Sequence, residues 1–249
     1  MVNFVGAGPG AADLITVRGM KLIETADVII YAGSLVNKEL LGYASQDCEI
    51  YNSAKMTLEE VVSVMERSRD KSVVRLHTGD PAVYGAIREQ MDELDRLGIE
   101  YDVCPGVSSM FGASAALKAE YTLPGVSQSV VITRMAGRTP VPEKESIESF
   151  AAHGATMVIF LSAGMLEELS NRLIAGGYAL ETPAAIVYKA THDDEKIVRT
   201  CVAELAKAAA ENGIAKTALI TVGGFLAGSY NRSKLYDPGF SHEFRKGKE

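Results

Sequence analysis

The chain has 249 residues, of which 47% are hydrophobic, and its formal net charge at pH 7 is −7. This length is typical of one large α/β domain or of two domains of ordinary size. The acidic balance argues against bulk nucleic-acid binding, which needs a basic face. No run approaches the roughly 18 apolar residues of a membrane span. The N-terminus lacks the basic region of a secretory signal, and the three cysteines lack paired spacing, so we expect a cytoplasmic protein.

Short apolar runs and helical patterns alternate through the first half of the chain. Each apolar run ends in a turn signal, and the stretch Thr57–Glu60 fits a capping box that opens a helix. Such βα alternation with short connections predicts a parallel sheet covered by helices on both faces. The expected strands are 2–5, 28–30, 72–77 and 101–104, and the expected helices include 82–97 and 108–117.

The second half has a different pattern. Regularity lapses between Leu117 and Ser129, so we expect an N-terminal domain over 1–120 and a C-terminal domain over 121–249. Two strands joined by the short loop Thr191–Glu195 predict a hairpin, and therefore a mixed sheet. The expected strands are 130–134, 157–161, 184–188, 196–202 and 218–222, with helices over 165–175 and 203–212. The fold class predicted is two α/β domains, the first with a parallel sheet and the second with a mixed one.

The first expected strand ends in a glycine-rich turn, Gly6-Ala7-Gly8-Pro9-Gly10-Ala11. This satisfies the loose pattern GxGxxA of a nicotinamide dinucleotide site. However, Pro9 lacks the amide hydrogen that a phosphate cradle uses. The second strand also runs into Tyr31-Ala32-Gly33 without an acid to hold a ribose hydroxyl. Taken alone, the motif is also compatible with a plain tight turn.

Two more polar turns follow later strands. The first is Thr78-Gly79-Asp80-Pro81 with Tyr84-Gly85, which places an acid and a glycine at the carboxyl end of a strand. That position suits a polar ligand, although Asp80 could instead cap the following helix, with Pro81 at its first position. The second is Cys104-Pro105-Gly106-Val107-Ser108-Ser109, which alone is an ordinary helix start.

In this order and spacing, the three motifs GAGPG, GDPxxYG and PGVSS resemble the tetrapyrrole (class III) methyltransferase family over essentially the whole chain. The resemblance implies that S-adenosylmethionine binds folded in a cleft between two α/β domains. It also implies which residues contact this methyl donor, with the second-domain positions 185, 187 and 219 the weaker candidates. The implied contacts are Pro9, Asp80, Val83, Ser108, Ser109, Leu161, Ala185, Val187 and Leu219.

Three longer strings, VVRLHTGDPAVYGAI, TRMAGRTPVPE and VYKATHDDEKIVRT, resemble the branch of this family that methylates carbon 11 of precorrin-4 or its cobalt complex. The resemblance therefore implies a role in corrin (cobalamin) synthesis, as a homodimer. One departure is His192, which stands where similar enzymes commonly have tryptophan. Three alternatives remain: a sister methyltransferase acting at another ring carbon, a nicotinamide-dependent oxidoreductase, and a non-catalytic tetrapyrrole carrier.

A corrin precursor carries several carboxylates, so its site needs cations. Methyl transfer from a sulfonium needs alignment more than covalent help, so we assign no nucleophile, metal ion or redox nucleotide. His77, beside the second motif, is interpreted as structural, and His192–Glu195 as a solvated hairpin tip and not an ion site. The candidate substrate-binding residues are Arg88, Arg134, Arg138, Lys189 and Arg199.

Overall fold

The computed structural model describes residues 1–33 and 35–248 of the chain. Their contacts divide into two compact units. The first unit comprises Met1–Ala113 together with Ala190–Asp194, and the second comprises Ser114–Lys189 and the chain after Asp194. The division falls inside the helix α4 (Ser109–Leu117). A domain boundary near residue 120 stays a prediction.

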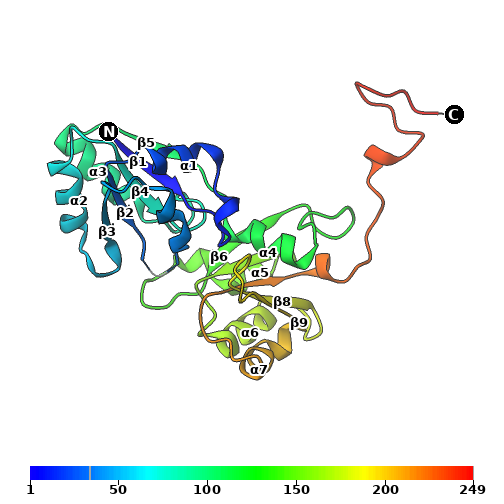
Figure 1. Cartoon of the computed structure of the whole chain (residues 1–249). Helices are drawn as coiled ribbons and strands as arrows, with labels where there is room; N and C mark the ends of the chain where they lie inside the picture. The colour runs from blue at the N-terminus through cyan, green and yellow to red at the C-terminus, as the bar shows by residue number, and fades with distance from the viewer. Residues whose placement is uncertain (34, 249) are drawn as a thin grey trace. The chain divides into compact units, whose positions relative to one another are not determined.

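The first unit contains a five-stranded sheet in the order β3-β2-β4-β1-β5, shown in blue to green in Figure 1. All four strand pairs are parallel, which confirms the predicted parallel sheet. Because β4, β1 and β5 are adjacent and parallel in this order, their carboxyl ends lie next to one another at one edge of the sheet. The strands are β1 (Val2–Gly6), β2 (Val28–Tyr31), β3 (Glu49–Asn52), β4 (Val73–His77) and β5 (Tyr101–Cys104).

Successive side chains of these strands point to opposite faces of the sheet, so the sheet builds two cores. On one face, Val5 packs in a cluster with Ile23 of α1 (Val17–Glu24) and Leu40 of the short helix η2 (Lys38–Tyr43). All three side chains are fully buried, and burial of each stabilises the fold by about 1.5–3 kcal/mol.

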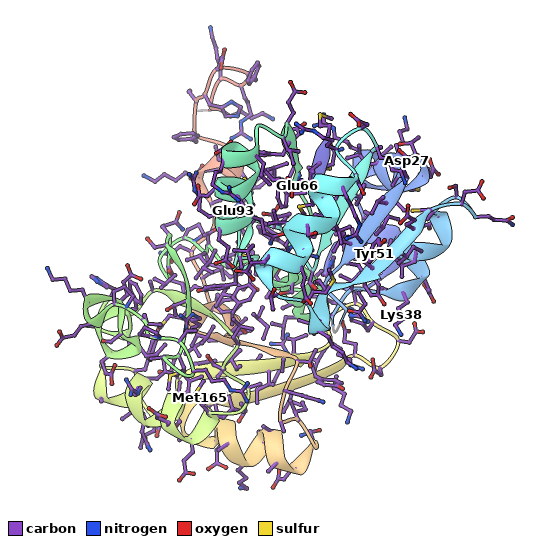
Figure 2. The ribbon with its side chains drawn as sticks, turned by 90° about the vertical axis from the view of Figure 1, so that its left-hand side faces the viewer. Asp27, Lys38, Tyr51, Glu66, Glu93 and Met165 are labelled. Atoms are coloured by element: carbon purple, nitrogen blue, oxygen red, sulfur yellow. The ribbon has the colours of Figure 1, made fainter. Side chains whose placement is uncertain are left out.

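On the opposite face, Phe4 packs with Met65 of α2 (Leu58–Arg67) and Leu94 of α3 (Ile87–Leu97). The two helices lie side by side in Figure 2, where Glu66 and Glu93 mark them. Helices on both faces of the parallel sheet are as predicted.

The capping box predicted at Thr57 is present. Thr57 N donates to Glu60 Oε2 at 2.8 Å, and Glu60 N donates to Thr57 Oγ1 at 3.3 Å. These reciprocal bonds satisfy two amides that the first turn of α2 leaves without helical partners, which is why the helix begins there.

The second unit contains a mixed sheet in the order β6-β7-β10-β8-β9. β6 and β7 are parallel, whereas β10 pairs antiparallel with both β7 and β8, and β8 pairs antiparallel with β9. The predicted hairpin and mixed sheet are therefore confirmed. The strands are β6 (Val130–Arg134), β7 (Thr156–Phe160), β8 (Pro183–Tyr188), β9 (Lys196–Cys201) and β10 (Ala218–Val222).

Three helices pack on one face of this sheet, namely α5 (Ile147–Ala151), α6 (Leu166–Ala175) and α7 (Leu205–Glu211). The core between them and the sheet includes Ile159, Ile186 and Ile220, one from each of the central strands. The alternate residues of the same strands point to the other face.

Two predictions about individual elements were wrong. Helix α3 begins at Ile87 and not at Ala82, because Tyr84 and Ala86 have left-handed φ values of 58° and 50°, which a helix cannot contain. The strand β3 was not predicted, because its residues are mostly exposed at the sheet edge and form no apolar run. Other strand and helix ends differ from the predicted ones by one or two residues.

The remaining regular elements of the described chain are short 3-10 helices: η1 (Ala12–Leu14), η3 (Ser53–Lys55), η4 (Glu143–Glu145), η5 (Val202–Glu204), η6 (Gly224–Leu226) and η7 (Lys234–Tyr236). Of the helices in residues 1–33 and 35–248, none is long and apolar enough to cross a membrane.

Candidate active site

The three glycine-containing loops singled out in the sequence meet in the first unit. They follow β1, β4 and β5, and β1 lies between the other two strands. Gly79 N donates to Gly8 O at 2.9 Å, and Gly8 N donates to Gly79 O at 3.3 Å, which joins the first loop to the second. The fold therefore gathers the motifs at the carboxyl edge of a parallel sheet, where ligands of α/β proteins bind.

Close backbone approach explains why glycines stand at these positions. A Cβ atom built on Gly6 would lie 2.5 Å from Gly106 Cα and 2.6 Å from Gly79 O, closer than real atoms pack. Gly8 and Gly79 also have φ values of +82° and +64°, which disfavour other residues. The glycines let three loops pack directly backbone to backbone.

Asp80 ties the second loop to the third. Its Oδ2 accepts a hydrogen bond from Gly106 N, and its Oδ1 accepts one from Ala82 N, both at 2.8 Å. Because α3 begins only at Ile87, Asp80 does not cap this helix, and the capping interpretation was wrong. The carboxylate instead fixes the turn after β4 and the start of the segment after β5.

The turn after Asp80 has an unusual backbone. Tyr84 and Ala86 adopt the left-handed region without being glycine, and a Cβ atom on the intervening Gly85 would collide with Pro81 O. Such conformations cost about 1–3 kcal/mol each and cluster at functional sites. Val83 lies in this turn and is half-buried. The sequence signal for the turn is Gly85 inside an otherwise helical pattern.

The candidate contacts of the first and third loops lie close to these glycines. Pro9 is buried, and a Cβ atom on Gly112 of α4 would lie 2.9 Å from Pro9 Cβ. Ser108 is buried just before α4, and Ser109 is the half-buried first residue of that helix. Of the implied methyl-donor contacts, Pro9, Asp80, Val83, Ser108 and Ser109 thus all lie on the three adjoining loops.

The hairpin tip belongs to this cluster. Thr191 Oγ1 accepts a hydrogen bond from Ala11 N at 3.0 Å, and a Cβ atom on Gly10 would collide with the His192 ring. Thr191 is half-buried, and so is His192, so the prediction of a solvated tip over His192–Glu195 was wrong for His192, although Asp193 is exposed. The tip covers part of the first glycine loop.

A second support of the glycine loop comes from Asn37, whose Nδ2 donates to Gly10 O at 3.0 Å. Neither Asn37 nor Thr191 was predicted as part of the site. Asn37 lies 27 positions along the chain from Gly10, and Thr191 lies 180 positions from Ala11. No local sequence pattern indicates pairs so far apart.

His77, at the end of β4, is 4% exposed, and its Nε2 has no hydrogen-bond partner among the described residues. Burial, together with the charge of Arg75, lowers the pKa of His77 to about 3. The imidazole is therefore neutral at neutral pH and holds no proton for acid catalysis. Its interpretation as a structural residue stays a prediction.

Arg75, on the same strand, is held inside the unit. Its Nε donates to Gln90 Oε1 at 3.0 Å and its Nη1 to Ile30 O at 3.2 Å, and Gln90 Nε2 donates to Ala86 O at 2.9 Å. Burial lowers the pKa of Arg75 to about 10, so the side chain stays charged near neutral pH. This chain of bonds anchors the end of the turn that carries Val83 and Tyr84.

In the second unit, Ala185, Val187 and Leu219 share one face of the mixed sheet. Leu219 is paired with Val187 across β10 and β8, and all three side chains are buried. They alternate with Ile186 and Ile220, whose side chains pack on the helices, so they point to the opposite face. The structure brings these three candidates together.

Leu161 follows β7 with a left-handed φ of 54°, and its side chain is 65% exposed. Backbone strain of this kind clusters at functional sites, so Leu161 stays a candidate contact. Its neighbour Ser162 is fully buried.

The candidate substrate-binding cations are dispersed. Arg134 is the last residue of β6, and its guanidinium donates to backbone carbonyls of the loop that follows, whereas Arg138 is exposed on that loop. Arg199 Nη2 donates to Leu117 O at 2.6 Å, and Lys189 Nζ lies 5.3 Å from the centre of the Tyr188 ring. In the first unit, the exposed Arg88 forms an ion pair with Asp92.

No group of three or more His, Cys, Asp or Glu side chains placed to hold a metal ion occurs in the part of the chain that the structure describes.

Comparison with known proteins identifies close relatives. The family model described as Tetrapyrrole (Corrin/Porphyrin) Methylases matches residues 1–206. The chain is 56% identical over 248 residues to the cobalt-precorrin-4 C(11)-methyltransferase of Methanocaldococcus jannaschii, and the match covers 98% of this chain and 96% of that protein.

Two solved structures extend the comparison. The crystal structure of a cobalamin biosynthetic enzyme, cobalt precorrin-4 methyltransferase, is 47% identical with a TM-score of 0.88, and the match covers 90% of this chain and 95% of that one. The uroporphyrin-III C-methyl transferase of Thermus thermophilus, solved with S-adenyl homocysteine, is 25% identical with a TM-score of 0.76 over 90% of this chain and 92% of that one.

Proposed function

The chain belongs to the tetrapyrrole (corrin/porphyrin) methylase family, and from this premise we propose that it transfers a methyl group from S-adenosylmethionine to carbon 11 of precorrin-4 or cobalt-precorrin-4 in corrin synthesis. The observation that carries the proposal is the 56% identity to a cobalt-precorrin-4 C(11)-methyltransferase along 98% of the chain. The three loops gathered at the carboxyl ends of β4, β1 and β5 supply the matching site.

The first unit offers the methyl donor a backbone surface with few side chains. Gly6 and Gly106 leave no room for Cβ atoms, and Gly79 has a φ of +64°, so the three loops pack backbone to backbone beneath the proposed donor site. Asp80, with both oxygens held by amides, keeps these loops in register. We propose that the donor contacts Pro9, Asp80, Val83, Ser108, Ser109 and Leu161, with Ala185, Val187 and Leu219 as further contacts.

The chemistry needs alignment from the protein and little else. The methyl group of a sulfonium is already activated for transfer, and the conjugated pyrrole nitrogens make carbon 11 of the acceptor nucleophilic. Holding the two reactants in line can contribute roughly 7–11 kcal/mol to lowering the barrier. No residue has to form a covalent intermediate, and neutral His77 is not required as an acid.

The acceptor is an anionic tetrapyrrole, so the proposed acceptor site uses cations. Arg138 is the foremost of these, because it is exposed on a loop stiffened by Pro140 and Pro142. Arg pairs with carboxylates through two parallel hydrogen bonds, which orients the macrocycle as well as attracting it. Lys189, Arg199 and Arg88 are weaker proposals. We further propose a cytoplasmic homodimer.

Calorimetric titration and mass spectrometry test this proposal together. The protein is expected to bind S-adenosylhomocysteine and not NAD. With S-adenosylmethionine it is expected to convert precorrin-4 or its cobalt complex to a product in which a methyl group replaces a proton, heavier by one CH2 unit, with S-adenosylhomocysteine and a proton released. Tight NAD binding without binding of S-adenosylhomocysteine would sink the assignment and favour an oxidoreductase. Transfer to uroporphyrinogen III instead would favour a sister enzyme.

A further inference from the structure

A single side chain holds the loop that follows β6. Arg134, the last residue of the strand, donates from Nη1 to Met135 O at 3.1 Å and to Thr139 O at 3.2 Å, and from Nη2 to Pro140 O at 2.8 Å. These bonds use three of the five N–H donors of the guanidinium. The loop 135–140 is therefore folded back around Arg134.

The loop closes on itself at Arg138. Gly137 N donates to Thr139 O at 3.2 Å, so the two neighbours of Arg138 are bonded to each other. A Cβ atom on Gly137 would lie 3.6 Å from Cε of Met165, which is labelled in Figure 2, so the loop rests on that side chain. These contacts fix the backbone on both sides of Arg138.

A buried serine fixes the start of the same loop. Ser162 is 0% exposed, and its Oγ accepts a hydrogen bond from Met135 N at 2.9 Å and donates one to Phe160 O at 2.7 Å. The second bond spans Leu161, the exposed residue with left-handed φ. Because β6 and β7 are adjacent parallel strands with Arg134 opposite Phe160, both segments leave the sheet at the same edge.

We propose that Arg134 and Ser162 are positioning residues: Arg134 fixes the loop that presents Arg138 to the tetrapyrrole, and Ser162 couples this loop to Leu161. The proposal rests on the proposed function, in which Arg138 and Leu161 face the acceptor and the methyl donor. It gives Arg134 a different role from the carboxylate partner that the sequence suggested. A preformed loop loses less conformational entropy when it binds its ligand.

Arginine suits this role better than lysine. Three carbonyls that point at one planar fork cannot all be satisfied in the same geometry by the single ammonium of a lysine. Removal of the Ser162 hydroxyl would leave Met135 N buried without its partner, which destabilises the local fold. Both side chains act through the backbone of their neighbours, so their effects on the reaction pass through Arg138 and Leu161.

A double-mutant cycle distinguishes positioning from direct binding by Arg134. Arg134→Gln is expected to raise the KM for the tetrapyrrole about as much as Arg138→Ala, roughly ten- to a hundredfold, and the double variant is expected to be no worse than the poorer single variant. Arg134→Lys should recover little. Arg96→Gln removes an exposed arginine of α3 and should change nothing. If the KM of the double variant instead rises by the product of the two single increases, the assignment is overturned, because independent effects indicate two separate carboxylate contacts.

Ser162→Ala has a matched control in Ser170→Ala. Ser170 is also buried, and its Oγ donates to Val202 O at 2.7 Å, away from the loop. Both variants are expected to lose thermal stability. Only Ser162→Ala should raise both the Kd of S-adenosylhomocysteine and the KM of the tetrapyrrole, by tenfold or more. If the Kd of S-adenosylhomocysteine and the KM of the tetrapyrrole are the same in Ser162→Ala and Ser170→Ala, Ser162 has no positioning role.

Hydrogen exchange separates this inference from the proposed function, because it needs no substrate. In the protein without ligand, Arg134→Gln is expected to accelerate exchange of the hydrogen-bonded amides of Met135 and Gly137 at least tenfold, whereas Arg138→Ala should not. Unchanged exchange in Arg134→Gln, with methyl transfer by the unaltered enzyme intact, overturns the inference alone. Absence of methyl transfer by the unaltered enzyme overturns the proposed function instead.

Discussion

Gly106 N donates a hydrogen bond of 2.8 Å to Asp80 Oδ2, and this contact joins loops that follow strands on either side of β1. The other carboxylate oxygen accepts from Ala82 N, also at 2.8 Å. Both acceptors are charged, so these bonds are stronger than neutral ones. One acidic side chain therefore holds the loop after β4 and the segment after β5 in a fixed relation.

Asp80→Ala removes both bonds. Bonds to charged groups each contribute about 1.5–3 kcal/mol, so the two together would contribute about 3–6 kcal/mol. Because Asp80 is half-buried, the free energy of unfolding is expected to fall by less, about 2–4 kcal/mol. Binding of S-adenosylhomocysteine should weaken at least tenfold under conditions where the variant is folded. Denaturant unfolding and calorimetric titration measure the two effects.

Asp102→Ala is the control for Asp80→Ala, because Asp102 is exposed and accepts a hydrogen bond from the amide of its neighbour Val103. It should leave both quantities nearly unchanged. An Asp80→Ala protein with reduced stability but normal affinity for S-adenosylhomocysteine would restrict Asp80 to a structural role.

Gly6→Ala tests the direct packing of the loops. The added Cβ atom would lie 2.5 Å from Gly106 Cα and 2.6 Å from Gly79 O. Both are backbone atoms, so one of the loops must move. Overpacking of this kind costs about 1–3 kcal/mol or more, and S-adenosylhomocysteine binding should be lost with it. Gly42→Ala, where no atom lies within 4 Å of the added Cβ, should be harmless. Equal unfolding temperatures of the Gly6→Ala and Gly42→Ala variants would refute the packing argument.

His77 should make stability depend on pH in a defined direction. Its pKa is about 3 in the folded protein against an ordinary value of 6.5, so the unfolded chain binds more protons between these values. The contribution of neutral His77 to the free energy of unfolding is therefore fully present above pH 6.5. It is lost as the pH is lowered towards 3, by up to about 1.4 kcal/mol per pH unit.

His77→Gln removes that contribution. As the pH is lowered from 6.5 to 4, the unaltered protein should therefore lose unfolding free energy relative to this variant. The carboxylates titrate in both proteins alike, so they cancel in the difference. Denaturant unfolding over this range is the measurement, and a difference that is constant with pH would show that His77 does not titrate as described. Methyl transfer near neutral pH should need no proton from His77.

Arg138→Ala should raise the KM for the tetrapyrrole roughly ten- to a hundredfold, the usual cost of a lost charge-assisted bond. The Kd of S-adenosylhomocysteine should stay nearly unchanged, because Arg138 is proposed to meet carboxylates of the acceptor. Lysine at this position should recover part of the loss, since it restores the charge but not the bidentate geometry. An increase in the KM for S-adenosylmethionine with no change in the KM for the tetrapyrrole would show that Arg138 does not contact the acceptor.

The sequence was sufficient to predict the two sheets and the three loops, because short apolar runs interrupted by Gly and Pro are local signals. It was not sufficient for β3, whose exposed edge residues form no apolar run. It also missed the late start of α3, because left-handed backbone at Tyr84 and Ala86 is imposed by packing around Gly85 and is not a preference of those residues.

The contacts that shape the site were the least predictable part. Thr191 reaches Ala11 across 180 positions, and Ser162 reaches Met135 across 27, so no window of sequence contains both partners. The role of Asp80 likewise changed from a possible helix cap to a tie between loops once the position of Gly106 was known. Residue types at strand ends identify a site, whereas the partners that hold it depend on the tertiary fold.

The central claim is that this chain methylates carbon 11 of a corrin precursor. Its most direct test is nuclear magnetic resonance of the product formed from precorrin-4, or its cobalt complex, and S-adenosylmethionine with an isotopically labelled methyl group. We predict a single labelled methyl group bonded to carbon 11. A labelled methyl group on any other ring carbon, or no transfer from the labelled donor, would contradict the assignment.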